Sequence, residues 1–161
     1  MITVAIASDH GGYELKEMIA GFLESMDYRV MDLGTNSPES VDYPEYGKKC
    51  AEAVASGQAD RGIVVCGSGI GSSIAANKVK GIRCALCTSV EMAELSRRHN
   101  DANMLALGGR TTEITLALNI VKKWLVTPFD GDRHERRVNQ LNEMYARTAE
   151  GGVQNGKSIC I

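Results

Sequence analysis

Short apolar runs alternate in this sequence with longer segments in which apolar side chains recur every three or four residues. The runs are typical of buried strands and lie at residues 2–7, 28–33, 62–66, 83–88 and 103–107. The longer segments have the spacing of one helix face, as Leu15, Ile19 and Leu23 illustrate, and a last helix begins near Asp132. Such alternation predicts an α/β fold: a doubly wound, Rossmann-like, five-stranded parallel sheet with helices on both faces and a C-terminal helix.

Helix boundaries and chain length outline the domain. Pro44 suits the first turn of a helix that stops at Gly57. Ser89 suits the N-cap of a helix that ends at Asn100. The 161 residues amount to the size of one domain. We expect it to span residues 1–148, with residues 149–161 as a flexible tail without periodicity.

Charge and composition exclude several kinds of partner. Eighteen Lys and Arg residues against twenty Asp and Glu give a formal net charge of −2, without the basic character of nucleic-acid-binding proteins. No apolar run approaches the roughly 20 residues of a membrane span, and no signal segment is recognised. The cysteines number five, and three lie in apolar runs, which favours a reducing cytosol over a disulfide framework. We therefore expect a cytoplasmic protein without nucleic-acid or membrane partners.

The residues directly after the strands are the candidates for a site, because doubly wound sheets bind ligands beyond the carboxyl ends of their strands. Asp9 and His10 follow the first strand. Residues 66–71 end the third strand, and residues 108–110 follow the fifth. These three segments are expected to meet at one edge of the sheet.

Residues 66–71 read Cys-Gly-Ser-Gly-Ile-Gly and are the most informative of the three segments. Alternate glycines let backbone N–H groups converge, and the following helix adds its positive end, which suits a phosphate or an oxyanion. The loop has neither the Gly-Lys-Ser/Thr ending of a Walker A motif nor the spacing of the dinucleotide fingerprint. A turn that only packs the helix against the sheet remains the alternative.

The cysteines differ in their predicted surroundings. Cys66 ends a strand beside a helix start, a position that favours thiolate as a base or nucleophile. Cys50 fits a buried apolar position. Cys84 and Cys87 have redox-motif spacing, but residues three apart in a strand face opposite sides of the sheet, so a dithiol function is disfavoured.

Histidines and arginines supply further candidate groups. His10, His99 and His134 lie in polar segments without metal-ligand spacing, so we interpret them as acid–base or phosphate-contact groups and expect no metal. Arg133 and Arg137 share one face near the start of the last helix, where two guanidinium groups suit a phosphate. A solvated charged face is the alternative for this pair.

Seven short motifs, in order over roughly residues 1–147, resemble ribose-5-phosphate isomerase of type B. The wider family includes galactose-6-phosphate isomerase subunits. The motifs lie at residues 9–12, 42–44, 66–71, 75–78, 81–83, 98–101 and 133–134. Ser68 stands where many family members have threonine, so the hydroxyl is kept and the methyl group that fixes its rotamer is lost.

The resemblance implies interconversion of ribose 5-phosphate and ribulose 5-phosphate through an enediolate, in the non-oxidative pentose phosphate pathway, without a metal or other cofactor. It makes Cys66 the base that moves a proton between C1 and C2, and His99 the acid that opens the furanose ring. Asp9 would position the sugar, and Ser68 would keep a catalytic hydroxyl. The remaining implied site residues bind the enediolate, the phosphate or the rest of the sugar, and are Gly67, Gly69, Ile70, Gly71, His10, Arg133, Arg137, Asn100 and Arg110.

Two other functions stay open. One is isomerisation of a six-carbon sugar phosphate, such as allose or galactose 6-phosphate, which depends on the length of the pocket. The other is a non-catalytic module that binds a sugar phosphate or nucleotide. Cys66 and His99 together argue against the second.

Topology predicts how the subunits associate. Cys66 ends a strand, whereas His99 ends a helix that runs back toward the opposite edge of the sheet. A strand of six residues spans roughly 20 Å, so one chain cannot bring both groups to one sugar. We therefore expect a homodimer of two-fold symmetry with two shared sites, or a higher oligomer built from it.

Overall fold

The computed structural model describes residues 1–150, with side chains as far as Met144, and the rest of the predicted tail lies outside the described residues. Five parallel strands form one sheet in the order β2-β1-β3-β5-β4. They are β1 (Thr3–Ser8), β2 (Arg29–Asp32), β3 (Arg61–Cys66), β4 (Cys84–Leu86) and β5 (Met104–Gly108). The predicted five-stranded parallel sheet is confirmed.

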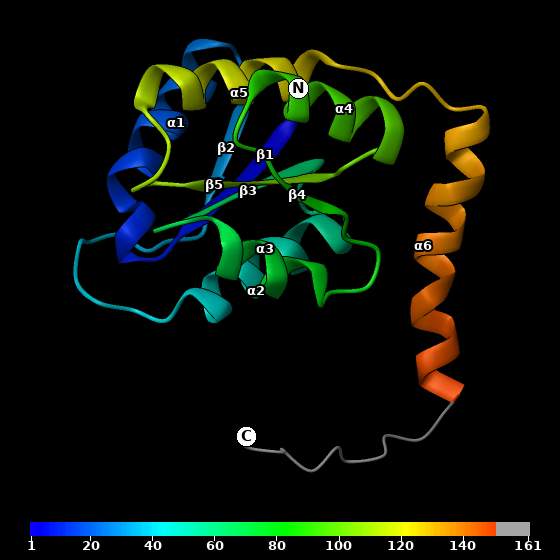
Figure 1. The fold of residues 1–161 in the computed structure, drawn as a ribbon. Coiled ribbons are helices and arrows are strands. Elements are labelled where there is room, and N and C mark those ends of the chain that lie inside the picture. Colours follow the sequence, from blue (N-terminus) through cyan, green and yellow to red (C-terminus); the bar gives the residue numbers. More distant parts are fainter. Residues whose placement is uncertain (151–161) are drawn as a thin grey trace, which may run out of the picture.

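Helices cover both faces of the sheet (Figure 1). They are α1 (Tyr13–Ser25), α2 (Tyr43–Ala55), α3 (Ile70–Asn77), α4 (Val90–Asn100), α5 (Ile114–Val126) and α6 (Arg133–Glu150), with a 3-10 turn η1 (His10–Gly12). Helices α1, α4 and α5 lie on one face, α2 and α3 lie on the other, and α6 stands at one side of the body. Helix α6 takes in the first two residues of the predicted tail, 149 and 150. None of the described helices is long and apolar enough to cross a membrane.

Each face of the sheet has its own buried core, because successive strand side chains point to opposite sides. Val4 and Ile6 of β1 pack with large side chains such as Trp124 of α5. Ala5 and Ala7 of the same strand pack in the second core, which is rich in alanine and lies under α2 and α3. Small side chains there let the two helices approach the sheet closely.

The edge strand β4 is shorter than the predicted run at residues 83–88. The backbone N–H of Arg83 donates to Asn103 Oδ1 at 2.8 Å and so leaves the ladder. At the other end, Ser89 caps α4 as predicted, because its hydroxyl accepts the Met92 N–H at 3.1 Å. The strand itself has three residues.

Cys84 in β4 and Cys87 directly after the strand lie on opposite sides of the sheet, as predicted. Cys87 belongs to the first core, and Cys84 packs against the second. Both are free thiols. Burial raises the pKa of Cys87 to about 11 and that of Cys50 to about 12, so these thiols stay protonated near neutral pH.

Candidate active site

A cavity of about 390 Å³ opens at the carboxyl ends of β1, β3 and β5. Adjacent β1 and β3 continue into helices on opposite faces of the sheet, which makes this the switch point where doubly wound folds bind ligands. The lining residues come from the end of β3, the loops after the three strands and the starts of α2 and α3, and are Asp9, Tyr43, Cys66, Gly67, Ser68, Gly71, Arg110 and Thr111. Six of these eight residues were candidates from the sequence.

Cys66 lies in the wall of this cavity, and the residue is 4% exposed. Its Sγ accepts the Gly69 N–H at 3.2 Å, and α3 begins at the next residue, Ile70. The sulfur thus lies beside a backbone N–H donor and the positive end of a helix dipole. Gly69 has φ +78°, and a Cβ there would lie 2.8 Å from the Leu107 backbone, so this donor position requires glycine.

The glycine loop offers backbone donors to the cavity. The N–H groups of Gly67 and Ser68 have no acceptor within the described part of the chain. The Ile70 N–H instead donates to Ser68 Oγ at 3.3 Å. Gly71 leaves room for the Tyr43 ring, which a Cβ at residue 71 would meet at 2.6 Å. The predicted anion cradle therefore rests on Gly67 and Ser68 and is walled by an aromatic ring.

Asp9 and His10 flank the cavity from the end of β1. Asp9 Oδ1 accepts the Gly12 N–H at 3.1 Å, so the carboxylate is fixed by the turn that it caps. His10 lines an adjoining cavity of about 230 Å³ that shares Arg110 with the first. Its Nδ1 lies 3.2 Å from the Val41 N–H, and in the tautomer that accepts this bond Nε2 carries a proton for a ligand.

A buried lysine and two exposed carboxylates help to hold the backbone next to Asp9. Lys16, whose side chain is fully buried, binds the Asp32 and Glu17 carboxylates. Burial acts to lower the pKa of Lys16, but the hydrogen bonds and charges of these two carboxylates outweigh it and raise the pKa. Asp32 Oδ1 also accepts the Gly34 N–H at 2.9 Å, and the Gly34 carbonyl accepts the Ser8 N–H at 2.6 Å. The pair thus links the end of β2 to the residue before Asp9.

A second group of chemically active side chains lies where α4 ends and α6 begins. The imidazole rings of His99 and His134 stack with 4.3 Å between centroids and 8° between planes. Asp130 lies beside them, and its carboxylate binds the Arg98 guanidinium with distances of 3.1 and 3.2 Å. Arg133 Nε lies 3.4 Å from His134 Nε2. We call these five residues the histidine cluster.

The histidine cluster suits an anion better than a metal ion. Ligand atoms of His99, Asp130 and His134 lie within 4.8 Å of one another, which is compatible with metal binding. However, Asp130 is already paired with Arg98, and parallel stacked rings do not aim their nitrogens at one point. The pKa of His134 is lowered by the burial of its ring and by the neighbouring charges of His99, Arg133 and Arg137. Such excess positive charge disfavours a further cation.

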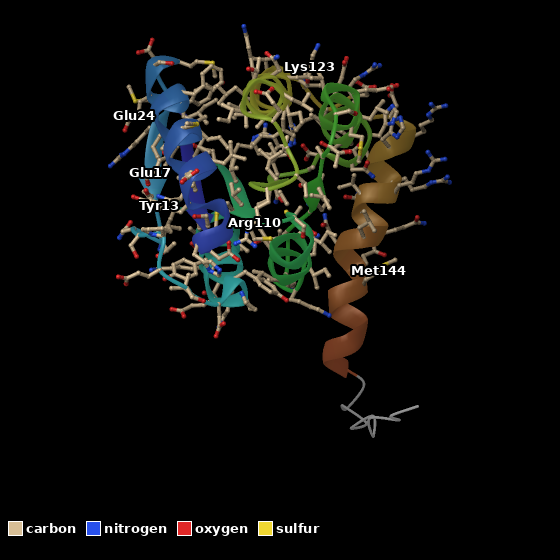
Figure 2. All side chains as sticks on the ribbon, turned by 60° about the vertical axis from the view of Figure 1, so that its left-hand side comes forward. Tyr13, Glu17, Glu24, Arg110, Lys123 and Met144 are labelled. Carbon is tan, nitrogen blue, oxygen red and sulfur yellow. The ribbon has the colours of Figure 1, made fainter. Side chains whose placement is uncertain are left out.

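Within one chain the cavity and the histidine cluster lie apart. In Figure 1, α6 stands at the side of the body opposite to the end where β3 runs into α3, and Figure 2 shows Arg110 and Met144 of α6 well separated. None of the described residues of α4 or α6 lines the cavity. The structure thus gathers Asp9, Cys66, Gly67, Ser68, Gly71 and Arg110 at one place, with His10 next to them. It leaves His99, Asn100, Arg133 and Arg137 on the other side.

Four residues of these sites were not among the sequence candidates, and one of them, Arg98, belonged to a recognised motif. Tyr43 belonged to a recognised motif, so a signal for it existed. Thr111 follows Arg110 directly and carried no signal of its own. Asp130 joins the cluster through contacts 31 residues away in sequence, which no local pattern reveals.

A thiol and an anion cradle at the switch point of a doubly wound sheet place the chain among α/β enzymes that act on phosphorylated substrates. The ribose/galactose isomerase family model matches residues 4–141, and the chain belongs to that family. The family predicted from the motifs is confirmed.

Individual relatives resemble the chain over most of its length. Ribose-5-phosphate isomerase B of Escherichia coli is 44% identical over 147 residues, which cover 91% of this chain and 99% of that protein. The structure of the Clostridium thermocellum ribose-5-phosphate isomerase B has a TM-score of 0.90 and 56% identity, and the match covers 91% of this chain and 99% of that one. The Mycoplasma genitalium enzyme with bound ribulose-5-phosphate has a TM-score of 0.86 and 37% identity, over 90% of this chain and 97% of that one.

Proposed function

We propose that this chain is an aldose–ketose isomerase that interconverts D-ribose 5-phosphate and D-ribulose 5-phosphate. The observation that carries the proposal is the Cys66 thiol in the cavity wall, with the Gly69 N–H on its sulfur and Asp9 lining the same cavity. The relatives described above are named for this activity. The reaction belongs to the non-oxidative pentose phosphate pathway, and the free thiols fit a reducing cytoplasm.

Cys66 acts as the base that transfers the proton. Its thiolate takes the C2 proton of the open-chain aldose, the electron pair forms the enediolate, and the thiol returns the proton to C1. A second proton passes from O2 to O1, beside the Ser68 hydroxyl and the Asp9 carboxylate, which line the same cavity. The N–H groups of Gly67 and Ser68 offset the negative charge that develops on the sugar oxygens.

The histidine cluster supplies the other half of the site. His99 donates the proton that opens the furanose ring, and Asn100 lies next to it at the end of α4. Arg133 and Arg137 bind the phosphate together with His10 of the cavity side, and Arg110 completes the wall between the two cavities. Phosphate binding energy then orients the reacting carbons toward Cys66.

The two halves meet when two copies associate about a two-fold axis, so that α6 of each chain reaches the cavity of the other. Two features support this homodimer with two shared sites. Cys66 and His99 are separated within one chain, as described above. In addition, apolar side chains stay exposed on α3 and on α6, namely Ile70, Ile74, Leu141 and Met144.

The function is tested by comparing turnover of ribose 5-phosphate with that of allose 6-phosphate and galactose 6-phosphate. We expect the five-carbon sugar to react fastest. Exchange of the C2 proton with solvent, followed by NMR in D₂O, separates the isomerase from a module that only binds. Faster turnover of a six-carbon sugar phosphate would mean that this sugar is the substrate. Binding without proton exchange would mean that the protein is not an isomerase.

Removal of metal ions is expected to leave the isomerase rate unchanged. The thiol, the N–H groups and the cationic cluster supply base, charge stabilisation and phosphate binding without a metal. The measurement is turnover after dialysis against a chelator and then against chelator-free buffer, with and without added Zn²⁺ or Mg²⁺. A loss of rate that added metal restores would make His99, Asp130 and His134 a metal site.

Replacing Arg137 with alanine is expected mainly to weaken substrate binding. A charge-assisted hydrogen bond contributes roughly 1.5–3 kcal/mol, so KM should rise about tenfold to a hundredfold. Inorganic phosphate should compete with substrate in the wild type and compete less well in the variant. Glu143→Ala, which changes another exposed side chain of α6, serves as the control. Unchanged inhibition by phosphate would mean that Arg137 belongs to a solvated surface.

Sulfate is expected to bind more tightly as the pH falls from 8 to 6. In the free chain, burial and neighbouring positive charges lower the pKa of His134. An anion bound beside the ring raises that pKa, so binding of the anion is coupled to uptake of a proton. Sulfate keeps its charge over this range, and its inhibition constant should fall roughly threefold to tenfold. A constant that is flat or rises would separate His134 from the anion site.

A further inference from the structure

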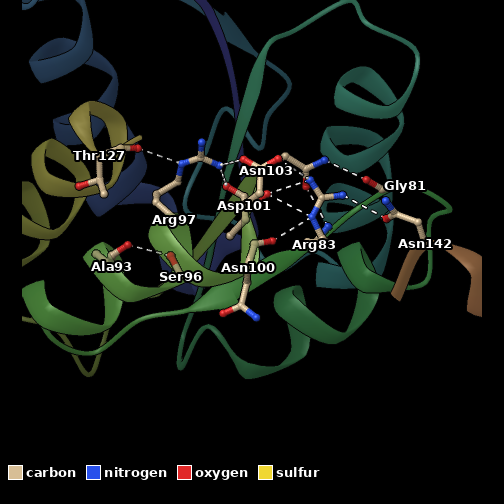
Figure 3. Close-up of polar contacts among 11 residues, drawn as sticks. Gly81, Arg83, Ala93, Ser96, Arg97, Asn100, Asp101, Asn103, Thr127 and Asn142 are labelled. Carbon is tan, nitrogen blue, oxygen red and sulfur yellow. Dashed lines mark hydrogen bonds and ion pairs between the residues drawn. The ribbon is translucent and has the colours of Figure 1, made fainter. Parts of the chain in front are cut away.

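The end of α4, which carries His99 and Asn100, is held by an arginine from another part of the chain. Asp101 ends the helix in the left-handed region, with φ 44°, and carbonyl groups at a helix end need donors. Arg83 supplies them: its Nε donates to the Asn100 carbonyl at 3.0 Å and to the Asp101 carbonyl at 3.1 Å. Its Nη2 donates to the Asp101 carbonyl at 2.8 Å (Figure 3).

The same guanidinium reaches α6. Arg83 Nη1 donates to Asn142 Oδ1 at 3.2 Å, and Figure 3 shows Asn142 approaching Arg83 from α6. Arg83 also lines a hollow of about 360 Å³ whose walls include Ile82, Leu141 and Met144, so apolar packing leaves a space between α6 and the body here. The bond to Asn142 gives α6 an attachment to the body in addition to the His99–His134 stack.

Arg83 is itself fixed by partners that do not belong to α6. Its backbone N–H binds Asn103 Oδ1 at 2.8 Å, and Asn103 Nδ2 binds the Gly81 carbonyl at 2.8 Å. Its Nη2 pairs with Asp101 Oδ2 at 3.2 Å, and Arg97 holds the other carboxylate oxygen of Asp101 at 2.8 Å. The Arg83 side chain is only 16% exposed. The guanidinium is therefore a preformed anchor to which α6 attaches.

We propose that Arg83 is a positioning residue that fixes the inclination of α6 relative to the end of α4 through Asn142. The bond keeps the phosphate-binding Arg133 and Arg137 in register with His99 and Asn100, so that they enter the site of the other copy as one unit. This inference rests on the proposed function for the roles of these four residues. The juxtaposition of Arg83 with α4 and α6 does not depend on it.

Asn142→Ala tests the attachment, because the side chain is exposed and its loss leaves the Arg83 bonds to α4 in place. We expect KM for ribose 5-phosphate and the inhibition constant of inorganic phosphate to rise about threefold to tenfold, with kcat within about twofold. Asn142→Asp, which keeps an acceptor for Arg83, should restore wild-type values. Arg83→Lys also loses donors to the end of α4, so it should lower kcat as well as raise KM.

The matched control is Asn139→Ala, one helical turn earlier in α6. Asn139 is also exposed, and its side chain makes no hydrogen bond within the described residues. It should leave KM, kcat and phosphate inhibition unchanged. Equal effects of the two alanine variants, or failure of Asn142→Asp to restore KM, would overturn the proposal. A kcat of Asn142→Ala that falls together with its unfolding midpoint would also overturn the proposal, because such a result indicates a role in stability only.

NMR of the imidazole groups tests the same inference without activity. The stacked rings of His99 and His134 shift each other's signals through their ring currents, because their centroids lie 4.3 Å apart. Asn142→Ala should move both sets of signals, and Asn139→Ala should not. Signals unchanged in Asn142→Ala would contradict the proposal. If the wild-type protein lacks isomerase activity but Asn142→Ala still moves the histidine signals, the proposed function is wrong and the positioning role of Arg83 remains.

Discussion

Cys66→Ala is expected to fold normally and to lose isomerase turnover by a factor of about 10² to 10⁴, which is what a positioned base contributes. The sulfur lies in the wall of the cavity, where it accepts the Gly69 N–H and adjoins the start of α3. A methyl group there keeps the loop and the backbone donors but cannot take the C2 proton. KM should change little, because the phosphate contacts are elsewhere. Steady-state rates in both directions give the measurement.

Cys84→Ala is the control for the loss of a thiol. Cys84 is partly exposed and lies on the edge strand, outside the cavity. Burial and the nearby Cys50 and Cys87 raise its pKa, so this thiol has no role as a base. We expect wild-type turnover and a small loss of thermal stability. Near-normal turnover in Cys66→Ala would mean that another group of the cavity is the base, and Asp9 is the first candidate.

A mixture of two inactive proteins, Cys66→Ala and His99→Asn, is expected to recover activity once subunits exchange. In a shared-site dimer of the two variants, one site contains both defects and the other contains neither. Equal mixing makes half of the dimers mixed, so recovery should reach about one quarter of the wild-type rate. The measurement is turnover over time after mixing, with exchange followed independently by mass spectrometry of isotopically labelled subunits.

A second mixture provides the control. Asp9→Asn and Cys66→Ala both alter the cavity side of the site, so in a mixed dimer every site keeps one defect. This pair should recover nothing under the same exchange conditions. Absence of recovery with His99→Asn, despite demonstrated exchange, would mean that Cys66 and His99 serve one site from one chain.

The alternation of the two apolar periods was enough to predict the sheet and its helices. Val4 to Ala7 are buried on both faces of β1, and such continuous apolar runs mark central parallel strands. The extent of β4 was not predictable in the same way. Arg83 looks like a strand residue in sequence, but its N–H binds a side chain that lies 20 residues further along.

The site was predictable where topology alone gathers residues. Asp9, Cys66 and Arg110 each follow a central strand, so parallel strands bring them to one edge. Tyr43 reaches the cavity because Gly71 has no side chain in its way, a contact that depends on three-dimensional fit. Asp130 joins the histidine cluster through its pairing with Arg98, 32 residues away, and local spacing carries no trace of such a pair.

The last helix contributes little to the two cores that keep the body folded. Neither buried core of the described chain contains a residue of α6. Apart from the buried Val138 and His134, substitutions on α6 therefore meet few of the packing constraints that hold the strands and α1 to α5. A chain built on this body can therefore change the residues proposed to bind the phosphate by varying one helix, without repacking the cavity around Cys66.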